Sequence, residues 1–364
     1  MLTNKEILQC KEQIFSHTDS YQVPFYNRTE SKEEILKKER ELQPGCAICI
    51  SQPLGTGKTF FVNNLIALKK LPIEIGERLL TFEGLATNRR TLEAEKGGLL
   101  LVDEGDIKTA WPNLATGLKK LSEHIQNNNK RAVILGDYCL RNPELTKLLP
   151  DITYLERFEP LTTEFLTGAL EARLSKFIPR IQRDIERGES FSFDLTELIQ
   201  PELIDILTPE WMVHNNSFRR LFVFLHLLTK TLPYNDQQCC FTFDMAYKLV
   251  TQSYDDRLDQ LSDDRQKRFL KALIEYVTEQ HPRGRGIAGG FTDDTLYTVA
   301  VNAGLSFDSL EQFREVISEP LTRVEFLTSV GTPYYDYDLN KFVKRPGPYV
   351  PSLALLILTY QKGK

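Results

Sequence analysis

The residues with the clearest chemical potential lie in one stretch, Cys46–Ile66, which reads CAICISQPLGTGKTFFVNNLI. An apolar run is followed by a loop that contains Gly55 and Gly57, and Lys58 and Thr59 then open an amphipathic segment. This order predicts a strand, a glycine loop and a helix, which is the context that a phosphate-binding loop requires. Glycines let backbone N–H groups turn toward phosphate oxygens, and the N-terminus of the helix adds positive charge. The stretch therefore predicts a nucleotide site.

Each residue type in this loop has an expected role. Lys58 can reach the β- and γ-phosphates, and the Thr59 hydroxyl can ligate Mg²⁺. Gln52 departs from the pattern G-x-x-x-x-G-K-[ST], because it stands where the first glycine is expected. An ordinary glycine-rich turn is the alternative interpretation. The residues expected to contact the nucleotide are Pro53, Leu54, Gly55, Thr56, Gly57, Lys58, Thr59 and Phe60.

A second motif, Leu99–Val102 followed by Asp103 and Glu104, supplies the carboxylates that ATP hydrolysis needs. Four consecutive apolar residues are typical of a strand buried on both faces of a sheet, and α/β sheets bind ligands at the carboxyl ends of their strands. We expect Asp103 to hold Mg²⁺ and Glu104 to orient the attacking water. The motif by itself is weak evidence, because acidic residues commonly end strands. Its position 45 residues after Lys58, in a chain whose strands alternate with helices, supports the functional interpretation.

Strands alternate with helices around these motifs, which predicts an α/β fold with a three-layer parallel P-loop sheet. The expected strands are 46–50, 78–82, 99–102, 132–135 and 152–155. Beyond Pro160 the pattern becomes helical. Near the C-terminus, three helices precede a strand pair at 325–329 and 334–344, which is the order of a winged helix. The predicted domains are N-terminal helices (1–44), the ATPase core (45–160), a helical lid (161–260) and a winged-helix-like domain (261–364).

PLGTGKT and LLLVDE together resemble the motifs of AAA+ ATPases, whose phosphate loop often reads GPPGTGKT. Residues 24–28 (PFYNR), with the helix Glu33–Leu42, are similar to the start of the branch that holds origin-recognition initiators and transposition-regulator ATPases. The junction between the last strand and the lid is similar too, through Pro160, Leu161, Thr162, Phe165, Leu170, Arg173 and Leu174. The resemblance spans residues 24–230 and lies in motifs alone. It implies ATP and Mg²⁺ as cofactors, and subunits that assemble with ATP between them.

The resemblance also implies three further roles. Sensor 1, the polar residue that ends the fourth strand, would be Asp137, where an Asn or Thr is more usual. Sensor 2, an arginine at the start of a lid helix, would be Arg219, with Arg220 as the next choice. The arginine finger given to a neighbouring subunit would be Arg141 or Arg157. Strand-end capping is the alternative for the aspartate, and a solvated arginine pair for sensor 2. The expected catalytic residues are therefore Glu104, Lys58, Asp137 and Arg219.

Composition limits the partners of this chain of 364 residues. A hydrophobic share of 41% and a charged share of 26% indicate an ordinary folded protein. A net charge of −5 argues against a protein that coats nucleic acid by charge alone, yet permits a local basic patch. The arginines and glycines of His281–Gly290 are able to follow a phosphate backbone, but a solvated loop is the more usual interpretation. Lys341, Lys344 and Arg345 cluster at the predicted wing, and DNA binding stays open. Residues 262–364 are neutral overall, with thirteen basic and thirteen acidic side chains.

Three functions remain open at this stage. The first is an ATP-dependent switch that acts on nucleic acid, as a replication or transposition regulator does. The second is a signalling or antiviral-defence NTPase whose C-terminal domain binds a partner protein. The third is a nucleotide-binding scaffold without catalysis, which Gln52 and the absence of a clear arginine finger make conceivable.

The chain has the features of a cytoplasmic protein without a membrane partner. Its first residues, MLTNKEILQCKEQ, are polar and helical in pattern, so we expect no signal peptide. The apolar run Leu353–Leu358 is too short to span a bilayer. Six cysteines without a framework spacing indicate a reducing compartment. Cys46 and Cys49 would point to opposite faces of a strand, so we expect no zinc site there.

Overall fold

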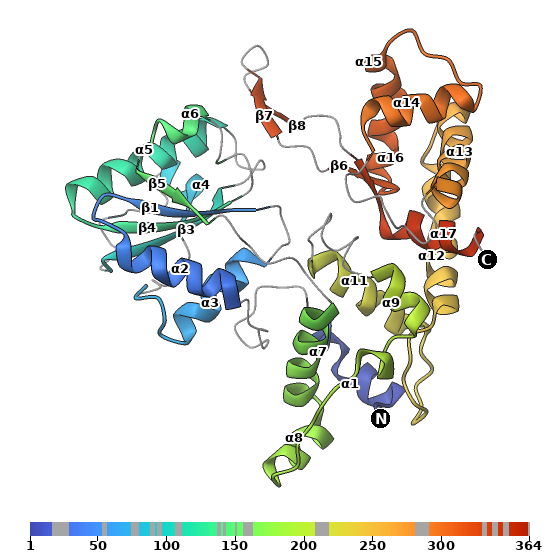
Figure 1. Cartoon of the computed structure of the whole chain (residues 1–364), viewed down its shortest axis with the longest axis horizontal. Coiled ribbons are helices and arrows are strands. Elements are labelled where there is room, and N and C mark those ends of the chain that lie inside the picture. The colour runs from blue at the N-terminus through green and yellow to red at the C-terminus, as the bar shows by residue number, and fades with distance from the viewer. Residues whose placement is uncertain are drawn as a thin grey trace. The chain divides into compact units, whose positions relative to one another are not determined.

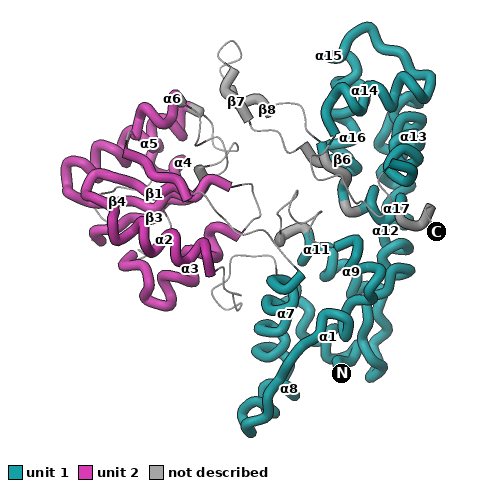
Figure 2. The backbone as a smooth tube through the Cα atoms, in the orientation of Figure 1, with its two compact units in different colours: residues 1–17, 160–331, 346–364 teal, residues 18–159, 332–345 magenta. Residues whose placement is uncertain are grey.

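The chain forms two compact units, which Figure 2 colours teal and magenta. Unit 1 comprises residues 1–17, 160–331 and 346–364, and unit 2 comprises residues 18–159 and 332–345. The computed structural model describes residues 1–16, 29–52, 57–73, 80–87, 92, 97–105, 111–136, 140, 143–149, 151–155, 163–207, 218–280, 291–329, 333–336, 341–344 and 349–362.

Unit 2 is built on a five-stranded parallel sheet in the order β2-β3-β4-β1-β5 (Figure 1). Its strands are β1 (Ala47–Ser51), β2 (Leu80–Thr81), β3 (Leu99–Gly105), β4 (Arg131–Gly136) and β5 (Ile152–Tyr154). Cys49 is in register with Ile134 on one side and with Tyr154 on the other, so β1 lies inside the sheet. The predicted parallel sheet is confirmed, with β2 only two residues long.

Helices cover both faces of this sheet, which makes the three predicted layers. The helices are α2 (Thr29–Glu41), α3 (Lys58–Ala67), α4 (Phe82–Ala86), α5 (Trp111–Asn127) and α6 (Pro143–Thr146). Ile48 and Ile50 join a core with α2 and α3, whereas Ala47 and Cys49 join a second core with α4 and α5. Successive strand residues point to opposite faces, so a continuous apolar run is what a doubly covered strand requires.

Helix α4 was not predicted, and its packing explains a glycine on α5. The Thr81 hydroxyl accepts a hydrogen bond from the Gly84 N–H at 3.1 Å, which caps the helix directly after β2. A Cβ on Gly117 would lie 2.8 Å from the Phe82 carbonyl oxygen. Only glycine therefore lets α4 and α5 approach this closely.

Unit 1 is helical apart from its C-terminal strands. It contains α1 (Asn4–Ile14), α7 (Thr163–Phe177), α8 (Pro179–Glu186), α9 (Pro201–Leu207), α11 (Phe218–Leu228), α12 (Phe243–Asp259), α13 (Asp264–Gln280), α14 (Asp293–Asn302), α15 (Leu310–Phe313), α16 (Glu319–Arg323) and α17 (Leu353–Lys362). The apolar run near the C-terminus belongs to α17, where Leu355 and Ile357 are fully buried. This helix packs on α9, α12 and α13, and so joins the lid helices to the C-terminal part.

The two units group the predicted domains differently. Helix α1 belongs to unit 1 and α2 to unit 2, although the sequence suggested one N-terminal segment (1–44). Helix α12 ends at Asp259, directly before the predicted boundary between residues 260 and 261. The fourfold division of the chain stays a prediction.

The C-terminal part of unit 1 has winged-helix topology, with a different strand pairing from the one expected. The predicted partner of β6 (Leu327–Ser329) was the segment 334–344, but β6 pairs antiparallel with β9 (Tyr349–Pro351). Phe291, between α13 and α14, bridges to Tyr349 on the other side of β9. The segment 334–344 instead forms its own hairpin, β7 (Pro333–Asp336) with β8 (Lys341–Lys344). Strand β9 was missed because three residues carry almost no periodic signal.

No helix in the described ranges has both the length and the hydropathy that crossing a bilayer requires.

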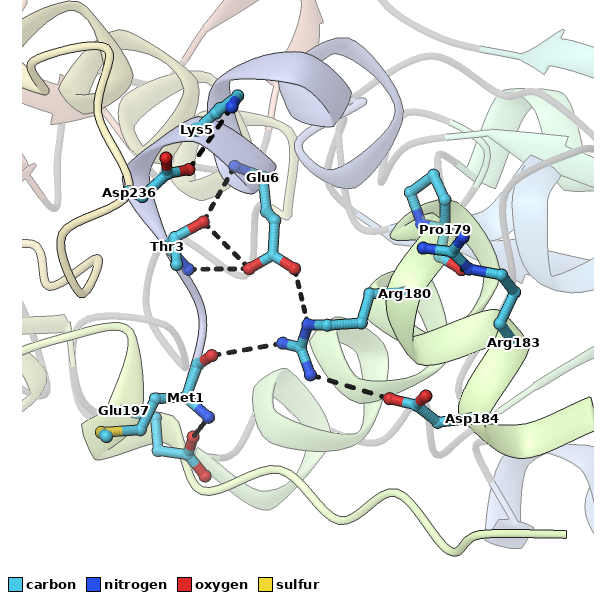
Figure 3. A network of polar contacts seen from close by, with 10 residues as sticks. All are labelled: Met1, Thr3, Lys5, Glu6, Pro179, Arg180, Arg183, Asp184, Glu197 and Asp236. Atoms are coloured by element: carbon cyan, nitrogen blue, oxygen red, sulfur yellow. Dashed lines mark hydrogen bonds and ion pairs between the residues drawn. The ribbon is translucent and has the colours of Figure 1, made fainter. Parts of the chain in front are cut away.

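The N-terminal segment is fixed to unit 1 by a polar network around Glu6 (Figure 3). Glu6 completes a capping box with Thr3 and accepts a hydrogen bond from Arg180 Nε at 2.8 Å. Arg180 Nη2 also donates to the Met1 carbonyl at 3.2 Å. Burial by itself raises the pKa of Glu6, but the hydrogen bonds from Arg180 and Thr3 outweigh it, so the pKa lies below its ordinary value of 4.5.

Replacing Glu6 with glutamine should lower the free energy of unfolding by about 1 kcal/mol at pH 7, because the cap and a charge-assisted hydrogen bond weaken. The stabilisation is complete above pH 4.5 and is lost as the pH falls through the lowered pKa of the folded state. The difference in urea unfolding between the wild type and the variant should therefore shrink as the pH falls below 4.5. Glu12→Gln is the control, since that side chain is 71% exposed on the same helix; an equal effect would contradict the role of the network.

Candidate functional site

The N-terminus of α3 has the backbone that the predicted phosphate loop requires. Gly57 precedes the helix with φ 83° and ψ 24°, in the left-handed region. Nothing lies within 4 Å of a Cβ built on it, so the conformation and not the space demands glycine. The Gly57 carbonyl accepts the first helical hydrogen bond, from Phe61 N at 2.9 Å. The first N–H groups of α3 have no carbonyl partner within the helix, which makes this end suited to an anion.

Lys58 is buried at the start of α3, and its ammonium group reaches the residue that follows β1. Only 6% of the residue is exposed, and Nζ donates a hydrogen bond to the Gln52 carbonyl at 2.9 Å. The Gln52 N–H donates to the Gly136 carbonyl at 3.0 Å. Both hydrogen bonds of Gln52 use its main chain, so this geometry does not need the glycine that the motif usually has here.

Thr59 connects the loop to the second motif. Its hydroxyl donates to Asp103 Oδ2 at 2.7 Å, and Asp103 is 8% exposed. These residues are 44 positions apart in the chain and come from α3 and β3. Strand β4 separates β1 from β3 in the sheet, so the helix that follows β1 reaches across the carboxyl end of β4 to meet Asp103.

Strand β3 carries a bulge at its acidic end, which the sequence did not reveal. Val102 pairs with Ile134, whereas Gly105 pairs with Gly136, so β3 uses one residue more than β4 over this interval. The extra residue falls at Asp103–Glu104. A bulge bends the strand, increases its twist and re-aims side chains, and bulges are frequent beside active sites. A bulge in an apolar run has no signal in the sequence, because the bulge is defined by the register with the partner strand.

Several predicted site residues lie outside the described part of the chain. These are Pro53, Leu54, Gly55, Thr56, Asp137, Arg141 and Arg157. The backbone of Glu104 lies in β3 and that of Arg219 in the first turn of α11, but their side chains are outside the described set. Of the predicted residues, the structure therefore brings together Gly57, Lys58, Thr59 and Asp103. Phe60 follows them in α3.

The chemistry of these groups fits a nucleotide with Mg²⁺. A hydroxyl and a carboxylate oxygen 2.7 Å apart can serve one small oxygen-seeking cation, directly or through water. Mg²⁺ usually takes only one or two protein carboxylates, because phosphates and water complete its shell. Lys58 and the start of α3 supply the positive charge that phosphates require.

Exchanging Gly57 for alanine should destabilise unit 2 by about 1–2 kcal/mol, because a left-handed conformation carries that cost for residues with a Cβ. Gly98→Ala is the matched control: a Cβ there also meets nothing within 4 Å, and its φ is not left-handed. Urea unfolding of both variants checks the difference. Equal stabilities would show that the loop relaxes to another conformation.

No protein-family model and no curated protein matches this chain. Among solved structures it is similar to the Aeropyrum pernix Orc1 protein in complex with DNA, with 11% identity, a TM-score of 0.43, and 96% of each chain covered. It is also similar to a chain of Drosophila ORC bound to DNA, with 14% identity and a TM-score of 0.44 over 98% of this chain and 91% of the other. Identities and TM-scores this low carry no argument, so the fold assignment rests on the strand order and register described above.

Proposed function

We propose that this protein binds ATP with Mg²⁺ and hydrolyses it, as an AAA+-type nucleotide-dependent switch. The observation that carries the proposal is the hydrogen bond between Thr59 and Asp103, 2.7 Å long, at the N-terminus of a helix that follows a left-handed glycine. Thr59 and Asp103 would hold the metal ion, and Lys58 would bind phosphate oxygens. The bound ion neutralises phosphate charge during transfer.

The remaining roles follow the resemblance of the motifs. Glu104, next to Asp103 in the bulge, would orient the attacking water. Asp137 follows β4, the strand between β1 and β3, and would lie near the γ-phosphate as sensor 1. Arg219 would contact phosphate from α11, so hydrolysis would change the relation between the two units. ATP would bind between subunits of a homo-oligomer, with Arg141 or Arg157 as the finger.

ATP turnover by the full chain tests the proposal directly. The assay compares ATP with and without Mg²⁺, over a range of protein concentrations. We expect Mg²⁺-dependent release of phosphate whose specific rate rises with concentration, because a shared site needs a second subunit. Tight ATP binding without turnover at any concentration would favour a nucleotide-binding scaffold, and no binding at all would overturn the proposal.

We further propose nucleic acid as the target of the switch. Winged-helix topology in unit 1 supports this, as do Lys341 and Lys344 on the hairpin strand β8, which the chain places between β6 and β9. Lysines on an extended hairpin suit a phosphate backbone. A titration with duplex DNA at 50 mM and 200 mM salt, with and without ATP, checks this. Binding that weakens steeply with salt supports it, and absence of binding at low salt would contradict it.

A protein target is the second candidate, and the charge of the helix-turn-helix favours it. Residues 291–325, which hold α14 to α16, contain seven Asp or Glu and two Arg, and no Lys. Glu311, Glu315 and Glu319 are exposed at four-residue intervals. Of the two arginines, Arg314 is already paired with Asp293 at 3.0 Å. Such a surface repels phosphates, so DNA would have to bind elsewhere on the chain.

A charge-reversal variant separates the two targets. Glu315→Lys and Glu319→Lys together should raise DNA affinity several-fold if the helices face the duplex, since each added cation can neutralise a phosphate. Unchanged DNA affinity together with wild-type ATP turnover would place nucleic acid away from these helices, whereas absence of DNA binding in both proteins would favour the protein target.

A further inference from the structure

An arginine buried in unit 1 joins three segments that are distant in the sequence. Arg173 lies on α7 and is 8% exposed. Its Nη1 donates to the carbonyls of Ile14 at 2.8 Å and Ser16 at 2.9 Å, at the C-terminal end of α1. The guanidinium carbon lies 4.0 Å from the centre of the Phe222 ring, on α11. A single side chain therefore contacts α1 and α11 from α7.

The charge of this arginine is unusual for its surroundings. Within the described ranges no carboxylate forms an ion pair with Arg173, and its Nε has no hydrogen-bond partner there. Burial lowers its pKa to about 9, so the side chain is still charged at neutral pH. A buried charge without a counter-charge is costly unless other groups replace its hydration. Here the two carbonyls and the Phe222 ring take that place, so the charge of Arg173 depends on α1 and α11 staying where they are.

Two of the segments that Arg173 joins, the end of α1 and α7, lie next to points where the chain passes between the units. Ser16 is the last described residue before α2, which starts at Thr29 and belongs to unit 2. Helix α7 begins at Thr163, shortly after β5 ends unit 2's sheet at Tyr154. The guanidinium thus connects the end of α1, where the chain leaves unit 1, to α7, where the chain returns to unit 1. Two carbonyls at a helix C-terminus are suitable acceptors for a cation, because that end carries partial negative charge.

The third contact concerns the helix expected to sense the nucleotide. Phe222 is three positions after Arg219, so the two residues lie on adjacent turns of α11 on one side of the helix. Phe222 is 1% exposed and cannot move independently of α11. The planar guanidinium stacks on this ring and donates to carbonyls at the same time, which an ammonium group does not do equally well.

We propose that Arg173 is the positioning residue that holds α11 to the end of α1 and to α7, and so sets the orientation in which α11 presents Arg219. This inference rests on the proposed ATP hydrolysis and extends it from the phosphate loop to the interior of unit 1. Arg173 itself does not touch the nucleotide. It keeps α11, the end of α1 and α7 moving as one body when the nucleotide changes.

The test compares Arg173→Met, Arg173→Lys and Phe222→Leu with Arg180→Met in the full-length chain. Arg180 is the matched control, because it also binds α1 from a neighbouring helix, but at the first turn through Glu6 and the Met1 carbonyl. Hydrogen exchange monitored by mass spectrometry reports on α11 and on residues 10–16, and steady-state kinetics report kcat and KM for ATP. Phe222→Leu keeps the arginine and removes only the stacking surface, in case the methionine variant does not fold.

We expect Arg173→Met to exchange about tenfold faster in α11 and at the end of α1. Its kcat should fall at least tenfold while KM stays within threefold. Arg173→Lys should recover part of kcat, Phe222→Leu should share the loss, and Arg180→Met should keep the wild-type kcat. Unchanged exchange in α11, or faster exchange with wild-type kcat, overturns the positioning role while ATP hydrolysis stands. A wild-type chain without turnover overturns the proposed function instead, and the role of Arg173 in turnover with it.

Discussion

A Glu104→Gln variant should bind ATP with wild-type affinity and hydrolyse it at least 100-fold more slowly. Glutamine keeps the size of the side chain but carries no charge and accepts no proton, and a positioned base contributes about 10²–10⁴-fold to such reactions. Phosphate release under saturating ATP measures the rate, and equilibrium titration measures the affinity. The expected result is a protein that retains ATP, because binding depends on Lys58, Thr59 and Asp103.

The control for this variant is Glu123→Gln on α5. That glutamate is 60% exposed and makes one ion pair of 4.0 Å with Lys119, so its loss should leave both affinity and rate unchanged. If Glu104→Gln hydrolyses ATP at the wild-type rate, Glu104 does not orient the water. If it loses affinity as much as rate, the glutamate belongs to the binding machinery.

The second large effect is expected at Lys58. Replacement by methionine keeps the length of the side chain and removes the charge that phosphates require, so ATP affinity should fall at least tenfold, or about 1.4 kcal/mol. The folded protein should tolerate the change, because the Gln52 carbonyl loses only one donor and a buried charge disappears with it. Calorimetric titration of ATP measures the affinity, and urea unfolding measures the stability.

Lys120→Met is a closely matched control for Lys58→Met. Lys120 belongs to the same unit, and its Nζ also donates to main-chain carbonyls, those of Leu85 at 2.9 Å and Ala86 at 3.2 Å. It lies on α5 and is not part of the phosphate loop. A comparable loss of ATP affinity in both variants would attribute the effect to weakened packing of unit 2. A loss confined to Lys58→Met locates the phosphate at α3.

In the winged-helix part of unit 1, the topology and the charge point to different partners. Topology alone favours nucleic acid, whereas residues 291–325 carry an excess of five negative charges, as large as that of the whole chain. The remaining residues of the range 262–364 compensate for this negative charge, so the range as a whole is neutral. The hairpin and the helices can therefore serve different partners.

The sequence by itself determined the local features of unit 2. Continuous apolar runs predicted the strands, since a doubly covered strand needs apolar residues on both faces. Gly57, Lys58, Thr59 and Asp103 were identified because their chemistry and spacing define a phosphate loop and a carboxylate. That these residues meet follows from the parallel sheet, whose carboxyl ends share one edge.

Only the tertiary structure decided the features that depend on distant partners. The pairing of β6 with β9, the bulge at Asp103–Glu104 and the separation of α1 from α2 all involve contacts between segments far apart in the chain, which a local pattern does not encode. The same holds for Arg173. In sequence it is one arginine of a lid helix, and only folding places it against α1 and α11, where a charge survives because two carbonyls and a ring replace water.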